Sequence, residues 1–141
     1  AFSSCNHLKK VEFSKNSELE RIEKSAFVNS SIEKFILPSR VKIIGDGAFD
    51  SCDSLKVFTV PEKSDLKIIE NYAFLKSSIR SIFIPQFVNQ IDNETFAECL
   101  NLKIIELSEN SNLRTIDVTE YEEYETLIMI PSRLRFSFNF N

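Results

Sequence analysis

The sequence is poor in the residues that make tight turns. Its 141 residues include only two glycines, both within Gly45-Asp46-Gly47, and only four prolines. A compact fold of this size usually uses more glycine in its turns. Tryptophan is absent as well, whereas phenylalanine occurs 13 times, an excess that a repeated phenylalanine position would explain.

Long apolar runs and an excess of positive charge are also missing. No stretch approaches the roughly 18 apolar residues of a membrane span, and no charged-then-apolar segment typical of a signal peptide opens the sequence. The net charge of −4 argues against general nucleic-acid binding, which needs a concentrated basic surface. Apolar residues make up 43% and charged residues 27% of the chain, so disorder is not expected.

Three related octapeptides show that the chain is built from repeats. Residues 1–8 read AFSSCNHL, residues 48–55 read AFDSCDSL and residues 95–102 read TFAECLNL. The cysteines Cys5, Cys52 and Cys99 are therefore separated by 47 residues twice. A period this regular predicts a stack of similar structural units.

Aromatic side chains divide each period into a longer and a shorter unit. They recur at intervals of 25 and 22 residues, at Phe2, Phe27, Phe49, Phe74, Phe96 and finally Tyr121. Each unit carries an apolar run whose last two members alternate with another residue, as in a short strand with one buried face: Leu8/Val11/Phe13, Ile32/Phe35/Leu37, Leu55/Phe58/Val60, Ile79/Ile82/Ile84 and Leu102/Ile105/Leu107. A second apolar pair follows in every unit: Leu19/Ile22, Val41/Ile44, Leu66/Ile69, Val88/Ile91 and Leu113/Ile116.

These patterns predict a solenoid with one short strand per unit, stacked about 4.8 Å apart in a parallel ladder around a narrow core. The expected repeats are residues 1–25, 26–47, 48–72, 73–94 and 95–119, and residues 120–141 should form a divergent last repeat and a β-type cap. Because the chain begins inside a unit, we expect a fragment of a longer array. The amphipathic segment of Leu134, Phe136, Phe138 and Phe140 is expected to cap the stack, the alternative being a strand that pairs with another chain.

The repeated cysteines are predicted to be buried thiols. Neighbouring cysteines should lie about 10 Å apart, whereas a disulfide needs Cα atoms within about 7 Å. His7 is the only histidine, so neither a zinc site nor a catalytic triad has support, and Glu120–Glu125 lacks the glycine of a calcium loop. We expect no enzyme activity, cofactor or metal. An intermolecular disulfide through Cys5 or Cys99 remains as an alternative.

The outward side chains of the predicted strands are the best candidate binding surface. Three columns are expected along the stack: Glu12, Ile36, Thr59, Phe83 and Glu106; Lys10, Lys34, Val57, Ser81 and Ile104; and Lys9, Glu33, Lys56, Arg80 and Lys103. The residues that we predict to contact a partner are Ile36, Val57, Thr59, Phe83 and Ile104, flanked by Lys56, Arg80 and Lys103. Exposed apolar strips often mark interaction sites, although β propensity or coverage by a neighbouring array would also explain these residues.

The units resemble the BspA-like leucine-rich repeats of mucosal protist and oral bacterial surface proteins, which read approximately C-x-x-L-x-x-I-x-I-P-x-x-V-x-x-I-G-x-x-A-F. Residues 52–61 (CDSLKVFTVP) and 41–49 (VKIIGDGAF) match this pattern closely, although the glycine after the isoleucine occurs only once, as Gly45. The alternating unit lengths are similar to those of protist, trichomonad- or amoeba-like members in particular. The resemblance, over residues 1 to about 121, implies a leucine-rich-repeat solenoid with a right-handed coil and turn or short-helix segments opposite the strands.

The resemblance also implies a cell-surface or secreted interaction protein, often linked to adhesion, without catalytic residues. We predict a non-enzymatic module that binds a host-surface or matrix protein, or a glycan, through its strand face, with no nucleic-acid binding and no membrane insertion of this fragment. The alternatives are a structural spacer or stalk that self-associates through its open repeat ends, and an intracellular scaffold. The sequons at Asn29 and Asn93 are compatible with secretion.

Overall fold

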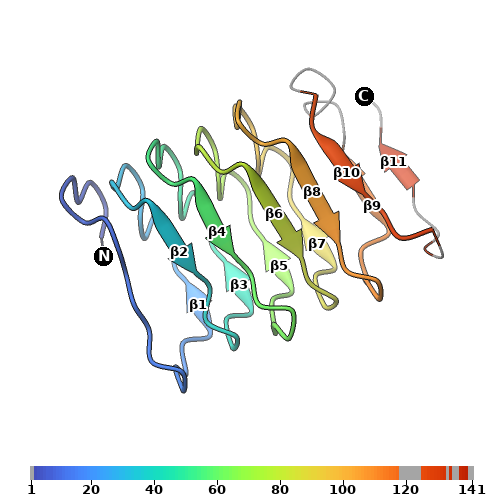
Figure 1. The fold of residues 1–141 in the computed structure, drawn as a ribbon, viewed down its shortest axis with the longest axis horizontal. Coiled ribbons are helices and arrows are strands. Elements are labelled where there is room, and N and C mark those ends of the chain that lie inside the picture. The colour runs from blue at the N-terminus through green and yellow to red at the C-terminus, as the bar shows by residue number, and fades with distance from the viewer. Residues whose placement is uncertain (1, 118–124, 133, 135–136, 140–141) are drawn as a thin grey trace.

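The computed structural model describes residues 2–117, 125–132, 134 and 137–139. In these residues the chain winds through short strands and turns and forms a parallel β-solenoid whose units stack side by side from the N-terminus to the C-terminus (Figure 1). The predicted solenoid and its parallel ladder are confirmed. Of the predicted turn or short-helix segments, the turns are present and the short helices are not supported, because every element in the described part of the chain is a strand.

The strands predicted from the alternating apolar runs form the ladder at the front of Figure 1. Four of them are β2 (Lys34–Ile36), β4 (Val57–Thr59), β6 (Ser81–Ile84) and β8 (Ile104–Leu107). A further strand, β10 (Leu127–Met129), continues the ladder beyond the five apolar runs. Phe35 is in register with Phe58, and Ile82 with Ile105, so equivalent buried side chains of neighbouring units lie against one another. An isolated bridge between Lys10 and Lys34 extends the ladder to the first unit.

A second ladder lies behind the first and corrects the expectation of one strand per unit. The strands β1 (Arg21–Ile22), β3 (Ile43–Ile44), β5 (Ile68–Ile69) and β7 (Gln90–Ile91) pair in this order, and β9 (Thr115–Asp117) pairs with β11 (Ser137–Asn139). These strands coincide with the second apolar pair of each unit, and Ile22, Ile44 and Ile69 are buried. The narrow core is therefore held between two ladders.

Each turn around a repeated phenylalanine contains two residues in the left-handed region. They lie two positions before and two positions after the phenylalanine. Their φ values lie between 54° and 62° in all four complete turns: Ser25/Asn29, Gly47/Ser51, Tyr72/Lys76 and Glu94/Glu98. The main-chain N–H of Asn29 donates to the carbonyl oxygen of Asp50 at 2.9 Å, and that of Ser51 to Leu75 at 2.7 Å. The turns thus bond from unit to unit, and their left-handed residues are incompatible with a helix.

The repeated phenylalanines form one continuous stack through the core. Neighbouring rings are nearly parallel, with centroids 5.2 to 5.6 Å apart, in the order Phe2, Phe27, Phe49, Phe74 and Phe96. The rings of Phe35 and Phe58, from the front ladder, meet this stack edge-on. Stacked and edge-on pairs are the favourable arrangements of aromatic rings, so this packing accounts for the abundance of phenylalanine.

The position three residues after each phenylalanine alternates between cysteine and serine, as Cys5, Ser30, Cys52, Ser77 and Cys99. Cys52 Sγ lies 3.6 Å from Ser30 Oγ, and Cys99 Sγ lies 3.6 Å from Ser77 Oγ. All three cysteines are free; Cys52 and Cys99 are buried and Cys5 is half-buried. A serine therefore lies in the intervening unit between successive cysteines.

The two ladders are interrupted at different units. In the front ladder, β4 and β6 belong to separate sheets, whereas behind them β5 pairs with both β3 and β7. In the back ladder, β7 does not pair with β9. In the front ladder, β6 and β8 of the same two units do pair. Every interruption among the described strands is consequently bridged by the other ladder.

The two ends of the stack differ from its middle. Leu8, Val11 and Phe13 of the first unit are half-buried, and Leu19, predicted to be the first residue of an apolar pair, is 37% exposed, because among the described residues this unit packs against the second unit only. Of the predicted cap strand, Ser137–Asn139 pairs with β9 of the same chain. Residues 120–124 of the acidic segment Glu120–Glu125, Tyr121 among them, lie outside the described ones, as do Phe136 and Phe140.

Candidate partner-binding face

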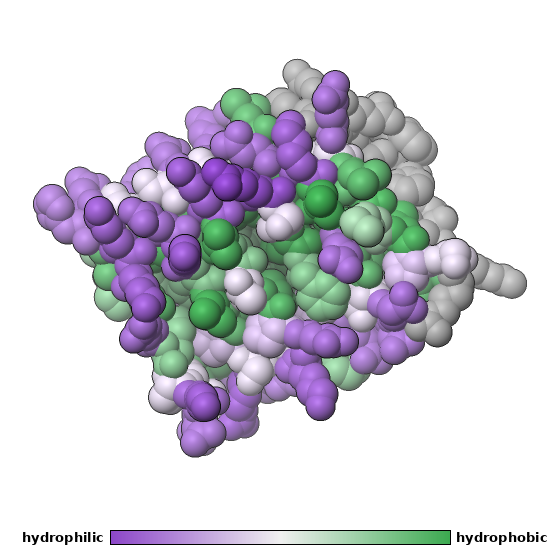
Figure 2. Space-filling model, in the orientation of Figure 1, coloured by the Kyte–Doolittle hydropathy of each residue, from purple (hydrophilic) through white to green (hydrophobic). Residues whose placement is uncertain are grey.

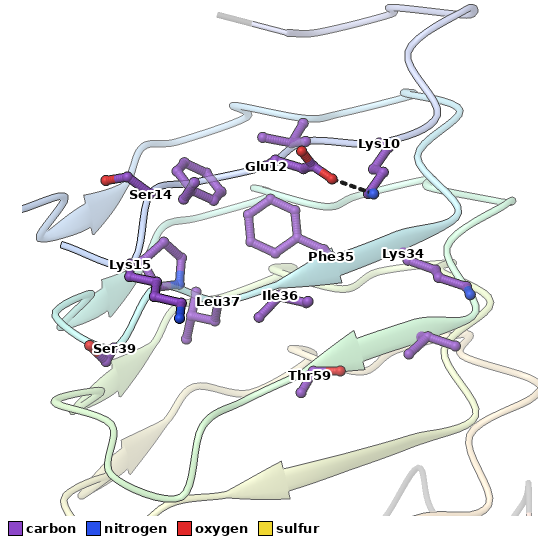
Figure 3. A pocket seen from close by; sticks show the side chains of 14 residues that line it. Lys10, Glu12, Ser14, Lys15, Lys34, Phe35, Ile36, Leu37, Ser39 and Thr59 are labelled. Atoms are coloured by element: carbon purple, nitrogen blue, oxygen red, sulfur yellow. Dashed lines mark ion pairs between the residues drawn. The ribbon is translucent and has the colours of Figure 1, made fainter. Parts of the chain in front are cut away.

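The outward side of the front ladder is hollowed over its first strands. A depression of about 700 Å³ lies over β2 and β4 and is also bordered by the extended segment Lys10–Lys15 of the first unit. In Figure 3, Ile36 and Thr59 lie in neighbouring strands, with Lys10 and Lys34 near the starts of the strands and Lys15 near the opposite end. The hollow therefore combines an apolar centre with a charged rim.

A second hollow of about 370 Å³ follows along the same face, over β4, β6 and β8. It shares Val57 and Thr59 with the first, so the two hollows are continuous along the stack. The second hollow lies over the interruption between β4 and β6, and its lining includes Phe83, Ile104 and Glu106.

Exposed or half-buried apolar side chains occur on this face in every front-ladder strand from β2 to β10. The exposed fraction is 65% for Ile36, 45% for Val57 and 38% for Ile104, and Phe83 is half-buried. Figure 2, which looks onto the front ladder, shows hydrophobic residues gathered at the centre of this face and hydrophilic ones around them. On β10, Leu127 and Met129 extend the strip and are 59% and 46% exposed.

Cationic side chains lie along the side of the strip where the strands begin. Lys56 and Arg80 are exposed and line the second hollow, and neither makes an ion pair within the described residues. Lys103 is exposed in the next unit, its main-chain N–H donating to the Arg80 carbonyl oxygen at 2.9 Å. In the first two units the equivalent charges are compensated, since Lys9 lies 3.8 Å from Glu33.

Several charged groups of the back ladder, by contrast, are paired within the chain. Arg21 reaches across β3 to Glu70, two units away, at 3.3 Å, and also lies 3.1 Å from Glu23. Glu70 accepts a further hydrogen bond from the main-chain N–H of Asp46 at 2.9 Å. These charged groups already bind one another, so fewer of them are available to a partner. The front face is therefore the better candidate for a binding site.

The structure brings most of the predicted contact residues together. Val57, Thr59, Phe83 and Ile104 line the second hollow with Lys56 and Arg80, Ile36 lines the first, and Lys103 lines neither. Leu127 and Met129 were missed, although the spacing of Leu127-Ile128-Met129 matches that of Ile104-Ile105-Glu106, with which it pairs in register. Whether these residues bind a partner stays a prediction.

The described residues offer little for catalysis. They contain no group of three or more His, Cys, Asp or Glu side chains placed to hold a metal ion. Burial raises the pKa of the Cys52 thiol to about 11, so at neutral pH it is the protonated form, which is a poor nucleophile. No helix with the length and apolar character of a membrane span occurs among them.

Two ladders, short repeats and a stacked phenylalanine core define the protein class as a leucine-rich-repeat-like solenoid. The family model of the BspA type leucine rich repeat region matches residues 1–103 in six copies, and the chain belongs to this family. No curated protein matches the sequence significantly. Both the family and the fold are those of repeat modules for protein interaction.

Two solved structures share the fold. A leucine rich cell surface protein from Faecalibacterium prausnitzii A2-165 is 26% identical, with a TM-score of 0.59 over 79% of this chain and 35% of that one. The pneumococcal vaccine antigen PcpA is 21% identical, with a TM-score of 0.57 over 86% of this chain and 45% of that one. The chain therefore spans less than half the length of either protein.

Proposed function

We propose that the chain is a non-enzymatic interaction module of a cell-surface or secreted protein and that it adheres to a host-surface or matrix protein through its front ladder. The observation that carries this proposal is the strip of exposed and half-buried apolar side chains from Ile36 to Met129 on one face. Apolar strips rimmed by polar residues are typical of interaction sites. The likeness to a bacterial cell-surface protein supports the location.

A protein partner suits this face better than a glycan does. The centre of the strip is aliphatic and carries one half-buried aromatic ring, Phe83. Apolar side chains from a partner would be buried against it, whereas the hydroxyl groups of a neutral glycan would lose hydrogen bonds to water there. We therefore assign a protein as the partner.

A spacer or self-associating stalk is the second candidate function. Phe2 is 44% exposed at one end of the ring stack, and within the described part of the chain Phe27 is the ring that stacks on it. A second copy stacked end to end would cover this ring. Self-association that Phe2→Glu abolishes, together with no strand-face binding, would favour this candidate.

Binding to purified matrix proteins tests the main proposal. The chain is passed over immobilised fibronectin, laminin and collagen, alongside the variants Ile36→Glu, Phe83→Glu and the double variant. We expect at least one of these proteins to bind and the double variant to bind at least about 30-fold more weakly, as at interface hot spots.

A matched control distinguishes the loss of this binding face from a general loss of exposed apolar surface. Leu100 is 60% exposed, similar to Ile36, but lies in a turn away from the strands, so Leu100→Glu should bind as the parent chain does. Unchanged binding by the double variant, or no binding to any of the three proteins, would overturn the proposal.

Two finer points remain predictions. The protist-type origin is supported only by the alternating unit lengths. The repeat boundaries 1–25, 26–47, 48–72, 73–94 and 95–119 are supported by the aromatic spacing, and deletion of residues 48–94, one whole period, should leave a shorter but folded stack.

A further inference from the structure

The apolar residues of the front ladder alternate between two columns. Ile36 is the third residue of β2, Val57 the first of β4, Phe83 the third of β6 and Ile104 the first of β8. The other outward position of each strand is polar: Lys34, Thr59, Ser81 and Glu106. The registers between β2 and β4 and between β6 and β8 place these positions in line, so the strip zigzags across the stack.

This zigzag has the spacing of one face of an α-helix. Paired strands lie about 4.8 Å apart. With the same spacing between β4 and β6, which are adjacent but unpaired, the four apolar residues would span about 14 Å along the stack. The a and d residues of a helix alternate across its contact seam with steps of about 4.5 and 6 Å, so four of them span about 15 Å. Four side chains on one face of an extended peptide span about 20 Å, so they would not match the spacing of the four apolar residues along the stack.

The charges beside the strip specify which flank of such a helix is acidic. Lys56 and Arg80 lie in adjacent units, line the second hollow and have no ion-pair partner among the described residues. Both precede the first residue of their strands, so both lie on the same side of the strip. A helix along the stack would meet them with one flank, and carboxylates there would give electrostatic complementarity.

We infer that the front ladder receives an amphipathic α-helix, laid across the strands, with apolar residues at its a and d positions and acidic residues along one flank. The inference rests on the proposed function and names the chemistry of the partner. Its apolar side chains pack between Ile36, Val57, Phe83 and Ile104. This is the helix-in-groove mode of recognition, applied to a sheet surface.

Designed peptides test this inference directly. The probe is a two-heptad helix, held by lactam bridges on its outer face, with leucine at a and d and glutamate along one flank. One control peptide has the same composition with leucine at every second residue, and another has lysine in place of glutamate. A sulfated heparin oligosaccharide serves as an anionic control without apolar groups. Affinity is measured by isothermal titration calorimetry.

We expect the acidic helix to bind at least about 10-fold more tightly than every control. The double variant Ile36→Glu/Phe83→Glu should weaken it by at least about 30-fold, while Leu100→Glu should not change it. The double variant Lys56→Glu/Arg80→Glu should weaken it by about 10-fold or more, and the loss should shrink at high salt. Lys67→Glu, exposed beside the back ladder, should have no effect.

Tighter binding of the extended control or of the oligosaccharide would overturn the inference, as would helix binding that the strand-face variants leave unchanged. The proposed function is judged separately by the matrix proteins. If one of them binds in a manner sensitive to Ile36 and Phe83 while the acidic helix does not bind, the inference fails and the proposed function stands. If neither binds, both fail.

Discussion

The Sγ atom of Cys52 donates a hydrogen bond to the main-chain carbonyl oxygen of Phe27, which lies 3.1 Å away in the preceding unit. Cys99 makes the same bond to Phe74, at 2.8 Å. The thiol thus links two consecutive units inside the core. Because the donor is the protonated thiol, the link depends on a proton that alkaline conditions remove.

This dependence predicts a specific loss of stability at high pH. Burial raises the pKa of Cys52 from its ordinary value of 9.0 to about 11. A raised pKa gives stability that is complete below pH 9 and is lost as the pH rises towards 11. The loss should reach about 2 to 3 kcal/mol. Urea unfolding between pH 8 and pH 11 measures it.

The variant Cys52→Ser is the control for this prediction, because serine occupies the same position in the shorter units, at Ser30 and Ser77. A hydroxyl does not ionise in this range. The variant should therefore lose less stability than the parent chain between pH 9 and pH 11, and equal losses would contradict the role of the thiol.

Phe49 lies in the middle of the ring stack, with Phe27 at 5.2 Å and Phe74 at 5.4 Å, and is fully buried. Phe49→Ala should lower the free energy of unfolding by about 3 to 5 kcal/mol, since it removes both stacked and both edge-on ring contacts and leaves a cavity. Phe2→Ala, at the exposed end of the same stack, should cost less than about 1 kcal/mol. Similar costs for the two variants in urea unfolding would contradict the stacked core.

Gly45 lies where the main chains of two units approach closely. A Cβ atom there would lie 2.8 Å from the carbonyl oxygen of Ile22 and 2.8 Å from the main-chain nitrogen of Lys24. Gly45→Ala should therefore cost about 2 to 3 kcal/mol, because main-chain atoms must shift. At Gly47 the nearest atom would be 3.6 Å away, and only the left-handed φ of 62° opposes alanine. Gly47→Ala should lower the free energy of unfolding by about 1 kcal/mol. Urea unfolding compares the two variants, and a greater loss for Gly47→Ala than for Gly45→Ala would contradict this packing.

Glu94 occupies the turn position that Gly47 holds in another unit, and its φ is 59°. Glu94→Gly should raise the free energy of unfolding by about 0.5 kcal/mol, because relief of the left-handed strain slightly exceeds the greater entropy of the unfolded chain. Glu62 is also exposed but lies outside the left-handed region, so Glu62→Gly should be destabilising. Thermal unfolding of both variants shows whether each one stabilises or destabilises the chain. Destabilisation by Glu94→Gly would contradict backbone strain at Glu94.

The front ladder could be predicted from the sequence because its strands repeat an alternation in every unit. Phe35 and Leu37, for example, are buried on either side of the exposed Ile36. The back ladder could not be predicted, since a strand as short as Ile43–Ile44 contains no alternation to detect. Its pairing arises only when neighbouring units bring equivalent residues together.

The turns were the least predictable part of the chain. Their two left-handed positions are taken by serine, asparagine, tyrosine, lysine and glutamate as well as glycine, so no residue type marks them. The unit-to-unit hydrogen bonds that stabilise these conformations depend on the whole stack. The interruption between β4 and β6, where the second hollow lies, likewise has no counterpart in the repeat pattern.

The central claim is that the exposed apolar strip serves recognition and not folding. The most direct test measures, for Ile36→Glu/Phe83→Glu, both the free energy of unfolding in urea and the affinity for the bound matrix protein. We predict that the free energy of unfolding falls by no more than about 2 kcal/mol, because Ile36 is 65% exposed and Phe83, which packs against the core, is only half-buried, while affinity falls at least about 30-fold. Unchanged affinity, or a loss of several kcal/mol in folding stability, would contradict the claim.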